Sequence, residues 1–226
     1  MRIITHRILL LLGCIASLAA THAALGQDMP AWTLPEGAVA TPVAEHMELN
    51  GIALDVQTVR AALPARELET AMQKSCTSAG ADFHAMDSGS EGLWQCRREG
   101  WSQVLRWQGR GSTTTGILST MPLDQKPAAV APAPLPLPDG TQPVSDLVSS
   151  DGGLRGRVLQ VVSPLNTDQL RQWFLDAAKS RDWKLAQALS RRPGAMSLRK
   201  KGQSIDIAFM PGAPSQVKIV MVWQNR

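Results

Sequence analysis

The sequence predicts an α+β protein of two duplicated modules, each a curved antiparallel sheet with one packed helix, joined by a Pro-rich linker. Two observations predict this fold class. Residues 51–121 can be laid over residues 153–223 without a gap, and twelve of the 71 aligned pairs are identical. Between them, seven prolines lie from Pro122 to Pro143. Self-similarity at a fixed spacing indicates a repeated structural unit, and a segment so rich in proline favours an extended, semi-rigid conformation.

The N-terminus has the pattern of an export signal. Residues 1–26 begin with two arginines, continue with a short apolar run and end in small residues, the order typical of a secretory signal peptide. A second interpretation is a lipoprotein signal that ends before Cys14, so that a lipid would anchor the protein. Both predict export, and we favour the periplasm. No later apolar stretch is long enough to span a bilayer. Residues 27–44 are expected to form an extended segment.

The first module is predicted over residues 45–121. Asn50-Gly51 is a hairpin turn signal, and the residues after it predict a strand over 52–60. Apolar residues at helical spacing predict a helix over 64–80. Further strands are expected over 82–87, 93–98, 101–108 and 113–121.

The second module is predicted over residues 145–226 and repeats this order. A strand over 154–162 precedes a helix over 166–182, which Asn166 or Thr167 can cap. Further strands are expected over 183–189, 195–200, 203–210 and 215–224. The linker between the modules covers residues 122–144 and would reach roughly 65 Å if fully extended.

The two cysteines that follow the export signal predict a disulfide. In an oxidising compartment, a lone pair of cysteines most simply forms one bridge. Cys76 lies on the helix face that meets the sheet, and Cys96 lies on the sheet face that meets the helix. A bridge between them would pin the helix to the sheet.

Residues 94–107 concentrate tryptophan and arginine in one predicted hairpin. Strand alternation turns Trp94, Cys96, Leu105 and Trp107 toward the helix. The hairpin also supplies a candidate binding surface, suited to an anionic group, that consists of Arg97, Trp101, Arg106 and Arg110. The simpler interpretation of the same residues is a solvated sheet face.

Charge is distributed unevenly between the two halves. Residues 27–125 carry 7 Lys and Arg against 12 Asp and Glu, net −5, whereas residues 126–226 carry 14 against 7, net +7. The modules could therefore dock on each other, or the second could face an anionic partner such as a lipid or glycan. Its candidate contacts are Arg191, Arg192, Arg199, Lys200 and Lys201. Nucleic acid is the less favoured partner, because exported proteins seldom meet it.

No motif for catalysis or for a cofactor is visible. The sequence has no nucleophile motif, no glycine-rich phosphate loop and no His or Cys spacing typical of a metal site. We therefore expect no cofactor, no metal and no enzymatic activity, and an enzyme with catalytic residues dispersed in the sequence is the third hypothesis.

The predicted layout, a helix held by an antiparallel sheet and present twice, resembles the helix-grip modules of small envelope proteins. The paired domains of the C lipoprotein of the outer-membrane barrel-assembly machinery are an example. The resemblance covers residues 51–121 and 153–223 in architecture alone. It implies a non-catalytic adaptor or accessory role through contacts with another envelope protein, which is our first hypothesis. The second is a binding module for an anionic envelope ligand, such as lipopolysaccharide, peptidoglycan or another polyanion.

Overall fold

The computed structural model describes residues 34–128, 131–186 and 194–225. The expected export signal, residues 1–26 with Cys14, lies outside these ranges. The described residues are mostly antiparallel sheet: 54% of them lie in strands, and they form two helices and two sheets that do not close. The α+β prediction is confirmed at this level. Neither described helix has the length and apolar character needed to cross a membrane.

The first sheet has six strands, and helix α1 (Ala65–Ser78) packs against one side of it. Every neighbouring pair is antiparallel. In spatial order the strands are β1 (Ala38–Pro42), β4 (Asp55–Ala61), β8 (Thr113–Pro122), β7 (Trp101–Arg110), β6 (Glu91–Arg98) and β5 (Asp82–Asp87). The helix therefore has one partner sheet and forms a core with it.

The second sheet has eight strands and carries helix α2 (Thr167–Lys179). As predicted, Asn166 caps this helix, and its side chain and that of Gln169 form a reciprocal capping box. In spatial order the strands are β11 (Lys184–Leu185), β12 (Ala195–Lys200), β13 (Gln203–Pro211), β14 (Val217–Asn225), β10 (Leu154–Ser163), β9 (Gln142–Asp151), β2 (His46–Leu49) and β3 (Ile52–Ala53).

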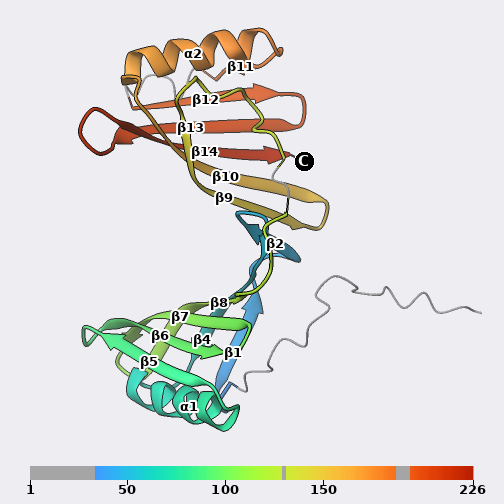
Figure 1. Ribbon diagram of the computed structural model, residues 1–226. Coiled ribbons are helices and arrows are strands. Elements are labelled where there is room, and N and C mark those ends of the chain that lie inside the picture. Colours follow the sequence, from blue (N-terminus) through green and yellow to red (C-terminus); the bar gives the residue numbers. More distant parts are fainter. Residues whose placement is uncertain (1–33, 129–130, 187–193, 226) are drawn as a thin grey trace, which may run out of the picture.

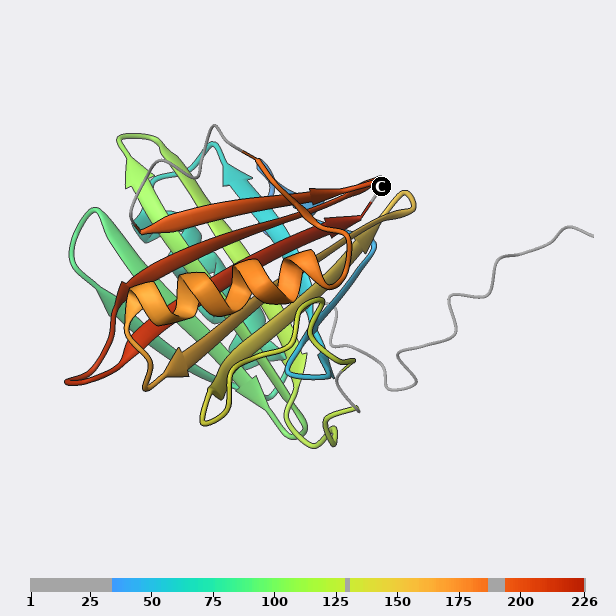
Figure 2. The ribbon, with the colours of Figure 1, turned by 90° about the horizontal axis from the view of Figure 1, so that it is seen from above.

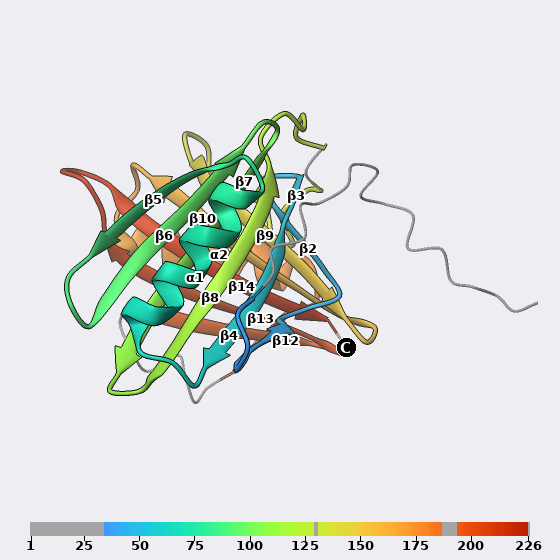
Figure 3. The ribbon, with the colours of Figure 1, turned by 90° about the horizontal axis from the view of Figure 1, so that it is seen from below.

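The two helices lie on the outer sides of the molecule (Figure 1). Seen from above, α2 covers the second sheet, and the first sheet lies behind it (Figure 2). Seen from below, α1 covers the first sheet, and the second lies behind it (Figure 3). The helix-free faces of the two sheets are therefore turned toward each other.

Six strands of each sheet follow the same spatial order. Strands β1, β4, β8, β7, β6 and β5 correspond to β9, β10, β14, β13, β12 and β11, with the helix after β4 or β10. Matching turns precede β1 and β9. The Ala38 N–H donates to the Pro35 carbonyl at 3.1 Å, and the Thr141 N–H donates to the Pro138 carbonyl at 3.2 Å. Strands β1 and β9 were not among the predicted elements.

The strand registers correct the gapless alignment of the two halves. That alignment pairs Ile117 with Ile219, but Ile117 is 45% exposed on the helix-free face, whereas Ile219 is fully buried under α2. Gly116 lies opposite Val59, and Ile219 lies opposite Val161. Because Val59 and Val161 are aligned, the position that matches Ile219 is Gly116. The alignment of the two halves therefore needs a gap of one residue in the first half, just before β8.

The hairpin of β2 and β3 leaves the first sheet and joins the edge of the second. Strand β2 pairs antiparallel with β9. The predicted Asn50-Gly51 turn is present, with both residues at positive φ. Asn50 exchanges two hydrogen bonds with the backbone of Asp146, at 2.7 and 2.9 Å, and the Ala128 N–H donates to the Gly51 carbonyl at 2.8 Å. Residues 46–53, expected in the first module, thus connect the two sheets.

The Pro-rich segment packs on the helix side of the second sheet. Leu135 is fully buried in the core under α2, with Ala133 and Leu137 packed beside it. The indole N–H of Trp173 donates to the carbonyl of Pro136 at 3.3 Å. Alternate apolar residues of this segment therefore form part of the core of the second sheet.

A buried arginine holds the start of this segment. The guanidinium of Arg157 donates to the carbonyls of Ala131 and Pro132, at 2.8 and 2.7 Å. The same group forms a bidentate ion pair with Asp146, at 2.6 and 2.8 Å, with both side chains less than 10% exposed. The segment joins β8 to β9. It is not only the extended, semi-rigid linker that its composition predicts, because Leu135 and Arg157 bind it to the second sheet.

Candidate functional site

Strand alternation sorts the side chains of the first sheet into two sets. Trp94, Leu105 and Trp107 face α1, are at most 3% exposed and contact Leu68 and Met72 of the helix. The two indole rings lie 5.1 Å apart. The prediction that these tryptophans are core residues is confirmed.

The disulfide between Cys76 and Cys96 is formed. It joins α1 to β6 with a Cα–Cα distance of 5.9 Å, and both cysteines are at most 5% exposed. Since the bridge lies inside the core, it stabilises the first sheet with its helix and is screened from reaction partners.

Four arginines project from the helix-free side of the first sheet, and we call this side the arginine face. They are Arg60, Arg97, Arg106 and Arg110. Three of them were predicted candidates. Sequence reasoning missed Arg60, although the buried Val59 and Ala61 on either side of it imply that it points away from the core.

Trp101 does not belong to this surface, contrary to the prediction. It is 8% exposed, and its odd-numbered position on β7 places it on the same side as Leu105 and Trp107. Arg106 stands at an even-numbered position of the same strand and so faces the other way. The proposed platform of arginine and tryptophan is therefore replaced by a platform of arginine and threonine.

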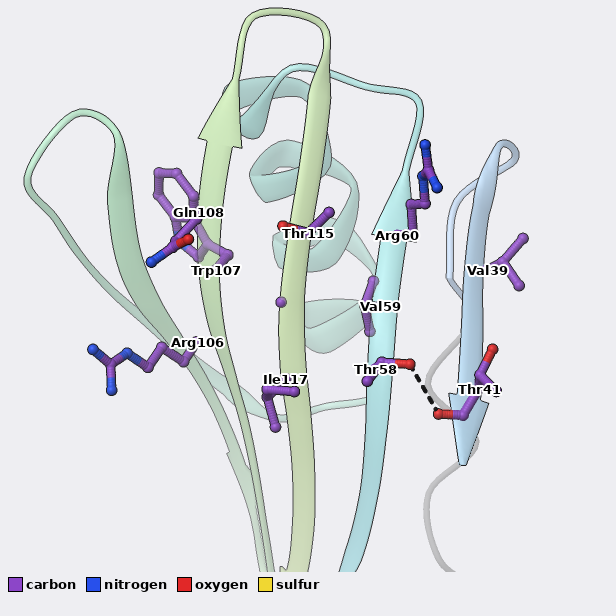
Figure 4. A pocket seen from close by; sticks show the side chains of 11 residues that line it. Val39, Thr41, Thr58, Val59, Arg60, Arg106, Trp107, Gln108, Thr115 and Ile117 are labelled. Carbon is purple, nitrogen blue, oxygen red and sulfur yellow. Dashed lines mark hydrogen bonds between the residues drawn. The ribbon is translucent and has the colours of Figure 1, made fainter. Parts of the chain in front are cut away.

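A hollow of about 870 Å³ lies on the arginine face across β1, β4, β8 and β7 (Figure 4). Arg60 and Arg106 stand on either side of β8, whose Thr115 and Ile117 lie between them. A second hollow, of about 420 Å³, lies next to it over β5 and β6. Arg106 lines both hollows and is therefore the central cation of this face.

The arginine face is cationic although its half of the chain is acidic. It carries four of the seven Lys and Arg found in residues 27–125. Two carboxylates share the face, Asp82 opposite Arg97 and Glu91 opposite Gln108. Arg60 and Arg106 lie opposite Thr115 and Ile117 on β8. Arg106 shares the second hollow with Asp87 and Glu91 but forms no ion pair with either among the described residues. Within the described residues, none of the four arginines forms an ion pair.

The basic residues predicted in the second module are arranged differently. Arg199 forms an ion pair with Asp206 at 3.0 Å, and the Lys200 ammonium donates to the Arg181 carbonyl at 2.9 Å. Lys201 is exposed in the turn between β12 and β13. Arg191 and Arg192 lie outside the described residues. Arg199 and Lys200 are thus less available to bind a ligand than Arg60 and Arg106, because each already interacts with another group of the protein.

Within the described ranges, no three His, Cys, Asp or Glu side chains are grouped as metal ligands. Comparison of the chain with protein-family models, curated proteins and solved structures finds no match. The site is therefore interpreted from its own chemistry. Two guanidinium groups with no carboxylate partner, beside hydroxyl groups and a half-exposed isoleucine, can bind anionic oxygens through charge-assisted hydrogen bonds.

Proposed function

We propose that the protein is an exported, non-catalytic binding protein that holds an anionic ligand on the arginine face. One observation carries the proposal: a half of the chain with net charge −5 gathers most of its cations on one sheet face, and two of them flank a hollow. A face that only kept the protein soluble would not need this segregation of charge. The threonine hydroxyls between the arginines add hydrogen bonds to the same ligand.

The duplication of the module is part of this proposal. The equal strand orders and the matching turns before β1 and β9 support a common origin for the two sheets. Export to the periplasm is supported by the disulfide, which persists in an oxidising compartment. The adaptor role implied by the resemblance to helix-grip modules stays a prediction, and an acidic partner protein would compete for the same face.

A short polyphosphate with a fluorescent label tests the binding site. Arg60→Gln combined with Arg106→Gln should weaken its binding at least about tenfold, since each guanidinium provides charge-assisted hydrogen bonds. Binding to the unaltered protein should weaken steeply with added salt. Fluorescence anisotropy measures both effects.

The matched control is Arg66→Gln combined with Lys74→Gln, which also removes two positive charges, here from exposed side chains of α1 on the other side of the sheet. This variant should bind polyphosphate like the unaltered protein. Equal losses in the control and in the variant of the arginine face would mean that net charge alone attracts the probe, and the proposed site would be wrong.

A further inference from the structure

The helix-free face of the second sheet carries a strip of apolar side chains, bordered by polar residues that include Gln160, Asp206 and Lys218. A sheet with one face on a core commonly turns polar side chains to water on the other. Here the second sheet already buries Leu159, Ile219 and Met221 under α2. Its other side nevertheless carries a continuous set of apolar residues, which we call the apolar face: Leu147, Val158, Val220, Val222, Ala208 and Met210.

The strand registers make this face continuous. Val158 lies opposite both Leu147 and Val222 on the neighbouring strands, and Val220 lies opposite Ala208. The contacts between the first sheet and the strands of the second are concentrated at β2 and β3, at one edge. An apolar strip of this kind marks an interaction site.

The two facing surfaces differ in character at three matching positions. By strand register, the first sheet has Arg60, Arg106 and Ser119 where the second has Val162, Ala208 and Val222. The faces are turned toward each other (Figure 1), and the joint formed by β2, β9 and the Asn50-Gly51 turn holds them there. At these positions the first sheet thus offers two cations, and the second sheet offers hydrocarbon.

We propose that the protein binds an anionic amphiphile, with its charged group on the arginine face and its hydrocarbon chain on the apolar face. This inference rests on the proposed function, because the arginine face supplies the site for the charged group. The charge of the first face and the apolar character of the second are both needed for such a ligand. A simple anion would leave the apolar face uncovered.

Two probes with the same phosphate group separate this inference from the proposed function. Lysophosphatidylglycerol, used below its micelle concentration, carries an acyl chain, and glycerophosphoglycerol, which has the same phosphodiester headgroup, does not. Isothermal titration calorimetry should show lysophosphatidylglycerol binding at least about tenfold more tightly, since each buried methylene adds to affinity. Equal affinities would overturn the inference and leave the anion site standing. If neither probe nor polyphosphate binds the unaltered protein, both the inference and the proposed function are wrong.

Variants of the apolar face identify where the chain binds. Val222→Asn should lower the affinity for lysophosphatidylglycerol about fivefold or more and leave the affinity for glycerophosphoglycerol unchanged. Met210→Asn, at the exposed end of the same face, should act in the same direction with less risk to folding, because Met210 is 38% exposed. The control is Leu185→Asn, on the other side of the sheet and 39% exposed. Unchanged lipid affinity in both variants would show that the acyl chain binds another surface. Conversion of a dimer to a monomer by these variants would show that a second copy of the chain covers the apolar face.

Discussion

Gly51 is the residue on which the joint between the sheets depends most. It has φ of 75°, and a Cβ there would clash with the carbonyl oxygen of Ala128. Gly153, the aligned residue in the β9–β10 turn, has φ of 85° and open space around its Cβ position. The two glycines share a backbone constraint, but only Gly51 is in close contact with another segment.

We therefore expect Gly51→Ala to destabilise the protein more than Gly153→Ala. The left-handed backbone costs each variant roughly 1 kcal/mol, and the clash with Ala128 should add about 1–3 kcal/mol at residue 51 alone. Urea unfolding monitored by tryptophan fluorescence measures the difference. Equal free energies of unfolding for the two variants would show that the close contact with Ala128 is dispensable.

At the same scale, the sequence predicts core tryptophans well and surface residues less well. Trp94 and Trp107 could be placed from alternation because their aligned partners, Met196 and Phe209, are also apolar. Trp101 is aligned with the polar Gln203, so the alignment of the two halves predicted an exposed position for Trp101. Its position on β7, in step with Leu105, was the better guide to its burial.

Among the elements, α1 is the one that a covalent bond holds to its sheet. The Cys76–Cys96 bridge closes a loop with a sequence separation of 20. Replacing both cysteines, Cys76→Ala with Cys96→Ala, should lower the free energy of unfolding by about 3 kcal/mol, because the unfolded chain regains the entropy that the bridge removes. Urea unfolding checks this value, and reduction of the unaltered protein should give a similar loss. A double variant as stable as the oxidised protein would contradict a stabilising role.

The Pro-rich segment behaves as an element of the second sheet. Leu135 is fully buried, so Leu135→Ala should cost about 2–4 kcal/mol through lost contacts and a cavity. Leu123→Ala is the control, because Leu123 lies in the same connection between β8 and β9 and is 40% exposed. Thermal unfolding compares them. If both variants have the same melting temperature as the unaltered protein, the segment does not contribute to the stability of the second sheet.

Helices and central strands were predictable, whereas the outer strands were not. The helical periodicity of residues 64–80 and the alternation of 101–108 reflect burial against one partner, which any single sequence reveals. Strands β1 and β9 contain prolines and little alternation. A usable signal existed in the LPEG and LPDG sequences at residues 34–37 and 137–140, whose glycines both have positive φ.

At the scale of the whole molecule, two sheets that share the order of six strands carry different side chains on their helix-free faces. The arginine face and the apolar face occupy matching positions on the two sheets, and the β2–β9 pairing turns them toward each other. The sequence indicated the charge difference between the halves. It could not indicate the facing arrangement, because the transfer of β2 and β3 to the second sheet depends on hydrogen bonds between residues about 100 positions apart, such as Asn50 and Asp146.

The most direct measurement of the central claim is a titration of the isotope-labelled protein with short polyphosphate, followed by two-dimensional NMR of backbone amides and arginine side chains. We expect the largest shifts at Arg60, Arg106 and Thr115, with little change at Lys200 and Lys201. Shifts concentrated at the turn that carries Lys200 and Lys201, with none on the arginine face, would contradict the central claim.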